Sequence, residues 1–139
     1  MVRRIIAGAL AAAVFAGCSA RTVSVPSNVT FGPPAAMPAP AVAANDDAPR
    51  ILAVRFSSEE VRRGQDWSGA VVASTNVASV EVRSSLFSIN VPRRGFGRFA
   101  FTAHVLDLPP IFIRGYRLRV IARNSAGAES EEDLPFRIR

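Results

Sequence analysis

Apolar residues recur at every second position in short runs through the second half of the chain, and polar or turn-forming residues separate these runs. A period of two is typical of half-buried β-strands, and no stretch after residue 50 has the period of an amphipathic helix. The runs predict seven strands: Ile51–Ser57, Trp67–Thr75, Val77–Arg83, Leu86–Val91, Phe99–Leu106, Tyr116–Ala122 and Leu134–Ile138. Their number and spacing predict an all-β, antiparallel sandwich over residues 50–139.

The segment Gly115–Gly127 resembles the penultimate strand and following turn of fibronectin type III and related bacterial immunoglobulin-like domains. The resemblance implies a seven-stranded antiparallel immunoglobulin-like (fibronectin type III-like) β-sandwich. It makes Tyr116 the tyrosine-corner residue, bonded to upstream backbone, and Trp67 the core tryptophan. The Leu108-Pro109-Pro110 approach to Tyr116 is longer than the usual spacing, and the lack of a cysteine pair excludes an antibody-type domain. The resemblance implies no particular function, because this fold hosts many activities.

Residues 1–17 have the features of an export signal peptide. Two arginines precede an apolar run, residues 5–16, which is shorter than the roughly 20 residues that a membrane-spanning helix needs. The sequence Phe15-Ala16-Gly17-Cys18 resembles the lipobox of bacterial lipoproteins, which implies a covalent lipid such as palmitate on Cys18. Ser19 after the cysteine implies the outer membrane in a Gram-negative cell. The alternative is ordinary signal cleavage after Ala20, which leaves a soluble product.

Residues 18–49 are rich in Ala and Pro and have no periodic apolar face. Such a segment cannot bury enough surface to offset its chain entropy, and its prolines favour an extended conformation. We therefore expect a flexible tether before the sandwich. The alternative is a partly ordered segment around Val23–Phe31 that packs on the domain.

All 17 basic residues are arginine, and the formal net charge is +6. If Tyr116 and Leu118 point into the core, the period of two places the intervening arginines on the outer face. An Arg-rich sheet face that could bind phosphate or carboxylate groups would then contain Arg83, Arg117, Arg119, Arg123, Arg137 and Arg139. A second basic group, Arg93, Arg94 and Arg98, lies in a predicted hairpin loop, where binding residues often occur. For both groups the alternative is an ordinary solvated surface.

No catalytic constellation is evident in the sequence. His104 is the only histidine, and no nucleophile or orienting partner lies near it in sequence. The acidic cluster of Glu129, Glu131, Glu132 and Asp133 lacks the ligand spacing of known calcium loops, which favours a solvated strand start. We therefore expect no catalytic residue, no metal and no cofactor apart from the lipid on Cys18.

These observations predict a non-enzymatic lipoprotein of the bacterial cell envelope, in which the sandwich is a tethered binding or assembly module. Its expected partners are the membrane, through the lipid anchor, and an envelope protein or anionic polymer rather than nucleic acid. The alternatives are a small envelope hydrolase or enzyme accessory domain, which requires His or acidic residues to converge in one groove, and a purely structural spacer.

Overall fold

A computed structural model describes residues 23–139 of the chain. The predicted signal peptide over residues 1–17 and the predicted lipid on Cys18 lie outside the described residues. Among the described residues, no helix has the length and apolar character needed to cross a membrane.

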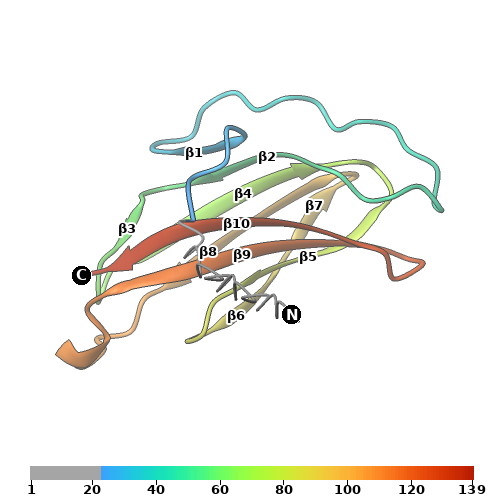
Figure 1. The fold of residues 1–139 in the computed structure, drawn as a ribbon. Helices are drawn as coiled ribbons and strands as arrows, with labels where there is room; N and C mark the ends of the chain where they lie inside the picture. Colours follow the sequence, from blue (N-terminus) through green and yellow to red (C-terminus); the bar gives the residue numbers. More distant parts are fainter. Residues whose placement is uncertain (1–22) are drawn as a thin grey trace, which may run out of the picture.

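Residues 23–139 contain ten strands and one 3₁₀ turn, arranged as two five-stranded sheets (Figure 1). The first sheet has the order β1-β2-β4-β8-β7 and the second the order β3-β10-β9-β5-β6. The elements are β1 (Val29–Phe31), β2 (Ile51–Phe56), β3 (Glu60–Val61), β4 (Asp66–Ala73), β5 (Val77–Arg83), β6 (Ser88–Val91), β7 (Arg93–Gly95), β8 (Arg98–His104), η1 (Pro110–Phe112), β9 (Gly115–Asn124) and β10 (Glu129–Ile138).

The core lies between the two sheets, where the alternating apolar residues of both sheets meet. Trp67 of β4 stacks on Phe56 of β2 with ring centroids 4.9 Å apart, and it lies 6.4 Å from Phe136 of β10 in the opposite sheet. Gly69 makes this packing possible, because a Cβ there would lie 2.6 Å from the ring of Phe101. The aromatic side chains thus join the two layers around Trp67.

The all-β prediction is confirmed, but the described residues contain more strands than the seven predicted, and two pairings are parallel rather than antiparallel. Strand β1 runs parallel to β2, and β3 runs parallel to β10. Strands β1, β3 and β7 are two or three residues long, so they show no alternation that a sequence pattern could detect.

The segment between β1 and β2 lies along the sandwich, as the arc in Figure 1 shows. The backbone N–H of Thr75 donates to Ala41 O at 2.8 Å, and the side-chain amides of Asn76 and Asn124 donate to Asp47 O at 2.7 and 2.9 Å. We expected a flexible tether over residues 18–49, whereas these hydrogen bonds hold residues 41 and 47 against the sandwich. From β1 onward, the described part of that segment belongs to the folded domain.

Candidate functional site

An apolar pocket of about 390 Å³ opens at the end of the sandwich where β8 and β10 finish. Its lining comes from both sheets, from the turn between β5 and β6, and from the loop after β8. The lining residues are Val61, Trp67, Leu86, Phe87, Ile89, Ala103, His104, Val105, Leu106, Leu108, Phe112 and Ile138. His104 is the only one of them with a titratable side chain.

The loop after β8 forms one wall of this pocket and is held in place by backbone contacts. Val105 and the turn before β4 exchange two hydrogen bonds, from Gly64 N to Val105 O at 2.8 Å and from Val105 N to Gln65 O at 2.9 Å. The Arg63 guanidinium donates to Leu108 O at 2.6 Å. Farther along, the Tyr116 hydroxyl donates to Phe112 O at 3.0 Å, which positions η1. The pocket is therefore largely preformed.

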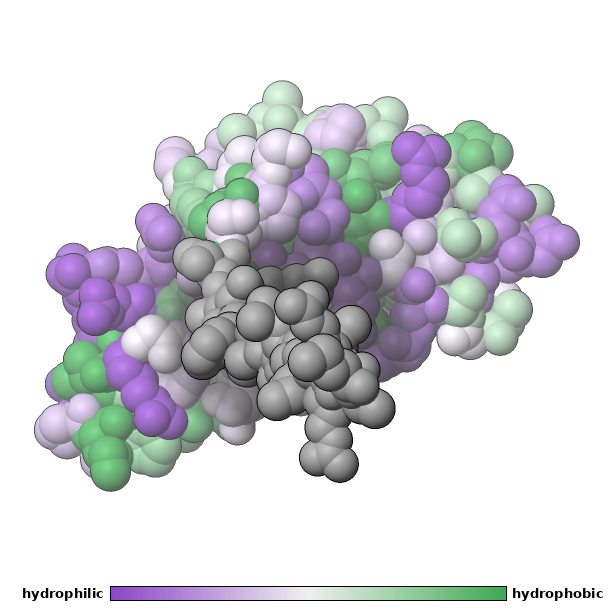
Figure 2. Space-filling view, viewed as in Figure 1, coloured by the Kyte–Doolittle hydropathy of each residue, from purple (hydrophilic) through white to green (hydrophobic). Residues whose placement is uncertain are grey.

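Exposed apolar side chains lie in the connection that forms one wall of this pocket. Leu106 is 69% exposed and Ile111 is 78% exposed, and both belong to the connection between β8 and β9. Hydrophobic residues also gather at this end in the space-filling view, at the lower left of Figure 2, where Figure 1 shows η1. An apolar pocket with an apolar rim is a typical binding feature of a protein surface.

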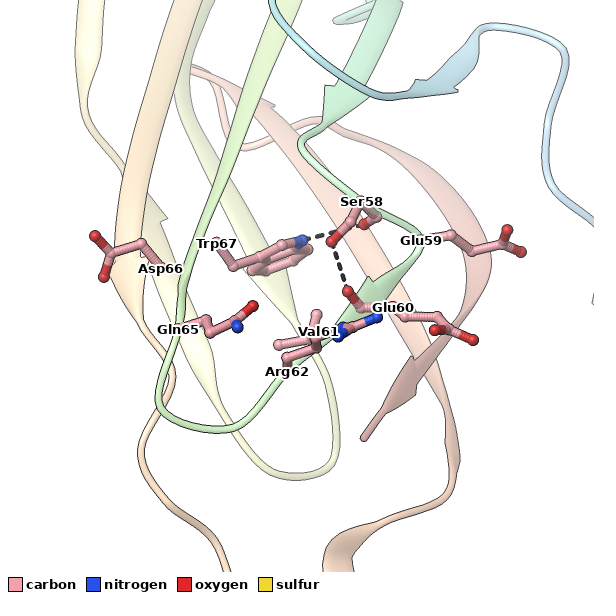
Figure 3. Close-up of a pocket in the computed structure, with 8 residues that line it drawn as sticks. All are labelled: Ser58, Glu59, Glu60, Val61, Arg62, Gln65, Asp66 and Trp67. Carbon is pink, nitrogen blue, oxygen red and sulfur yellow. Dashed lines mark hydrogen bonds between the residues drawn. The ribbon is translucent and has the colours of Figure 1, made fainter.

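A polar hollow of about 340 Å³ lies beside the apolar pocket and shares Val61 and Trp67 with it (Figure 3). The indole N–H of Trp67 donates to Ser58 O at 3.3 Å, and the Ser58 hydroxyl donates to Glu60 O at 2.5 Å. Glu59 and Asp66 point away from the indole ring in Figure 3. Because the carboxylates do not converge, we assign no chemistry to this hollow.

His104 lies at the mouth of the apolar pocket, beside a carboxylate. Its Nδ1 atom is 2.9 Å from Asp66 Oδ1, since the two residues are direct partners across β4 and β8. Both side chains are exposed, at 62% and 71%. The pocket lining contains no Ser, Thr or Cys that this pair could activate as a nucleophile. The pair supplies a polar contact at the rim of an otherwise apolar cavity.

Five of the six predicted sheet-face arginines lie on three adjacent strands, β5, β9 and β10, and Arg139 directly follows β10, but acidic residues neutralise most of this face. The β9–β10 register places Glu129 opposite Arg123 and Asp133 opposite Arg119. Ion pairs join Arg83 and Arg123 to Glu81, Arg123 to Glu129, Arg119 to Glu131 and Asp133, Arg117 to Asp133, and Arg139 to Glu60. Among the described residues, Arg137 alone of the six has no such partner.

Glu81 is the centre of this ion-pair network, and only 6% of it is exposed although it lies on the outer face. The Ser88 hydroxyl donates to its carboxylate at 2.5 Å, and Arg123 and Arg83 donate at 2.9 and 2.8 Å. These hydrogen bonds, with that of Ser88 the largest contribution, lower the pKa of Glu81 from 4.5 to about 2. The hydrogen bonds from Arg123 to Glu129 and Glu81 raise the pKa of Arg123. These arginines therefore have carboxylate partners within the fold.

The other predicted basic group forms the β7–β8 tip, residues 93–98. Arg93, Arg94 and Arg98 are exposed there, together with Phe96, which sequence reasoning did not single out. Sequence reasoning also missed the apolar pocket. Its lining residues read as ordinary core positions or as unpatterned loop residues, and no sequence signal distinguishes them.

No protein-family model matches the chain, and no curated protein sequence matches it either. Two similar solved structures are superoxide reductases (neelaredoxin) from Ignicoccus hospitalis. The first, a variant form of that protein, is 14% identical with a TM-score of 0.42 and covers 66% of this chain and 80% of its own. The second is 14% identical with a TM-score of 0.40 and covers 67% and 81%.

This comparison corrects several predictions. Both of the solved structures named above are superoxide reductases, and neither is named as a fibronectin type III domain or a lipoprotein. These names disagree with the predicted immunoglobulin-like lipoprotein, with the predicted non-enzymatic envelope module and with the predicted lipid on Cys18 as the sole bound group, so we do not carry these predictions further. The similarity assigns no activity to this chain, because both the identity and the TM-scores are low.

The chain's own residues do not fit the metal centre of a redox enzyme. The whole sequence has one histidine and one cysteine. Within residues 23–139, no group of three or more His, Cys, Asp or Glu side chains lies close enough to hold a metal ion. Imidazole and thiolate are the ligands that redox-active transition metals prefer in proteins, so this donor set is too small. We derive no reaction step through a metal.

Proposed function

We propose that this protein binds a small apolar molecule in the pocket at the end of β8. The observation that supports this proposal is the lining, in which eleven apolar residues and one histidine enclose about 390 Å³. This volume lies in the range of roughly 300–1,000 Å³ that is typical of small-molecule sites. The aromatic rings of Trp67, Phe87 and Phe112 provide flat surfaces for a ring or an alkyl chain.

The lining also indicates which ligands would bind poorly. An ionised group placed inside the pocket would lose its hydration without gaining a partner, so the buried part of the ligand must be uncharged. A hydroxyl or carboxylate could remain at the mouth, where His104 lies beside Asp66. The ligand class that fits is an alkyl or aromatic molecule with at most one polar end.

Trp67 provides a direct measurement, because it is the only tryptophan in the sequence and it lines the pocket. We expect the neutral aromatic probe N-phenyl-1-naphthylamine to quench the fluorescence of the full chain to saturation, at one probe per protein. Quenching that rises linearly without saturating would contradict the proposal.

A pair of substitutions on β8 tests where the probe binds. Ala103→Leu adds volume inside the pocket, whereas Thr102→Leu adds the same side chain to the exposed face of the same strand. We expect Ala103→Leu to weaken probe binding by about tenfold or more, because filling a packed site costs on the order of 1–3 kcal/mol. Thr102→Leu should leave it unchanged. Equal affinities in the two variants, with unchanged thermal melting, would place the probe elsewhere.

A further inference from the structure

The β7–β8 tip places a phenylalanine at the surface among arginines. Phe96 is 74% exposed, and Arg93, Arg94 and Arg98 beside it are exposed as well. The guanidinium of Arg93 lies over the Phe96 ring, 4.8 Å from its centroid. An exposed aromatic ring at a hairpin tip contributes nothing to the core, so its side chain is available for a partner.

The backbone holds this tip in one conformation. Gly97 has a φ of +64°, and a Cβ at this position would collide with Ala73 O and lie 2.7 Å from Pro40. The amide of Ala73 donates to Gly97 O at 2.8 Å, which ties the tip to the end of β4. Only glycine permits this close approach. Binding at the tip would therefore cost little ordering of the backbone.

The charges at the tip differ from those of the other arginine group. Within residues 23–139, none of Arg93, Arg94 and Arg98 forms an ion pair, whereas five of the six arginines of the sheet face do so. The positive field at the tip is therefore not cancelled by neighbouring carboxylates. Such a field attracts anions and strengthens as ionic strength falls.

A surface that binds both the Phe96 ring and the tip arginines must present anionic groups above an apolar layer. The interface of a phospholipid bilayer has this structure, because phosphate groups lie directly over the acyl region. Arginine binds phosphate through paired hydrogen bonds, and an aromatic ring is stabilised at the boundary below it. A dissolved anionic polymer offers the charges but no layer in which the ring of Phe96 could be buried.

We propose that the β7–β8 tip binds the surface of an anionic phospholipid bilayer, with Phe96 inserted and Arg93, Arg94 and Arg98 on headgroup phosphates. This inference does not depend on the apolar pocket, which lies at the opposite end of β8. Each arginine near an anionic surface strengthens binding by about fivefold, and insertion of Phe96 strengthens it by at least about tenfold.

The test is sedimentation of the full chain with vesicles of phosphatidylcholine containing phosphatidylglycerol, compared with pure phosphatidylcholine. We expect Phe96→Ser to weaken binding to the anionic vesicles by about tenfold, and the triple variant Arg93→Gln, Arg94→Gln, Arg98→Gln to weaken it by about a hundredfold. The matched control replaces Arg62, Arg114 and Arg137 by Gln. These three arginines are exposed and without ion pairs among the described residues, so the charge change is the same.

A second measurement reports insertion directly. In Phe96→Trp the new indole should be quenched by brominated lipids well beyond the quenching of Trp67 in the unaltered protein. Absence of that additional quenching would overturn the proposal, as would equal binding by the tip and control triple variants. Binding to heparin that depends on the tip arginines, together with unchanged vesicle binding by Phe96→Ser, would assign the tip to a soluble polyanion and would also overturn it.

Discussion

The Arg-rich sheet face and the β7–β8 tip contain the same kind of side chain in opposite electrostatic settings. On the sheet face, β10 places Glu129 and Asp133 directly opposite arginines of β9, and Glu81 joins Arg83 to Arg123. At the tip, no ion pair is formed among the described residues. The difference shows that an arginine's contribution depends on strand register: where a cross-strand carboxylate faces it, the arginine stabilises the fold.

The largest expected effect is on the backbone that holds the tip. Gly97→Ala places a Cβ against Ala73 O and forces a left-handed φ on a residue that disfavours it. We expect a loss of about 3 kcal/mol in the free energy of unfolding, measured by urea denaturation. Gly127→Ala is the control, because Gly127 also has a positive φ of 88° but no atom within 4 Å of its added Cβ. Equal losses in both variants would show that contact with Ala73 does not matter.

The next effect concerns the centre of the sheet-face network. Glu81→Gln removes a carboxylate that three donors share, and we expect a loss of about 2 kcal/mol at neutral pH. The pKa of Glu81 is lowered from 4.5 to about 2, so its ionised form stabilises the fold. This stabilisation is fully present above pH 4.5 and is lost as the pH falls through about 2.

Urea titrations from pH 7 to pH 2 measure this dependence. The difference in unfolding free energy between the unaltered protein and Glu81→Gln should shrink steadily below pH 4.5. A difference that stays constant down to pH 2 would mean that the carboxylate charge is not the source of the stabilisation.

A smaller effect is expected at the more exposed part of the same face. Asp133 accepts hydrogen bonds from Arg117 and Arg119, and 27% of its side chain is exposed. Water and salt screen this pair, so Asp133→Asn should cost about 1 kcal/mol or less, and the cost should fall further in 1 M NaCl. A cost independent of salt would indicate lost packing rather than lost charge.

The smallest effect is expected at the tip itself. Arg94→Gln removes an exposed guanidinium that has no acidic partner within residues 23–139, so the free energy of unfolding should change by less than about 0.5 kcal/mol. If Arg94→Gln lowered the free energy of unfolding as much as Asp133→Asn does, the tip arginines would stabilise the fold as the sheet-face arginines do, and the comparison of the two regions would fail. The matching measurement on the sheet face is Arg119→Gln, which breaks contacts with both Glu131 and Asp133.

The sequence predicts the long strands well, because β4, β8 and β9 are seven to ten residues long and turn an apolar or small side chain toward the core at every second position. It does not predict β1, because a three-residue strand in a Pro-rich segment is stabilised by its pairing with β2 rather than by its own pattern. The pairing of Glu129 with Arg123 could be predicted from the sequence. The turn after Asn124 reverses the chain directly, so Glu129 must return beside Arg123.

The candidate pocket was not predictable in the same way. Trp67 and Ala103 belong to the core alternation, whereas Leu106 and Phe112 come from a loop without any period. The position of the loop decides whether these side chains pack into the core or line a pocket. The hydrogen bond from the Arg63 guanidinium to Leu108 O fixes that position. That contact joins residues 45 positions apart and has no local signature.

The short strands at the sheet margins also affect how copies of this protein can associate. In residues 23–139, β1, β7, β3 and β6 are the outermost strands of the two sheets, and each is only two to four residues long. A long free strand would offer unpaired backbone N–H and C=O groups on which another chain could polymerise. The outermost strands themselves offer room for very few such bonds. Edge-to-edge joining of crowded copies would therefore have to use the part of β10 before Arg137, along which β3 does not pair.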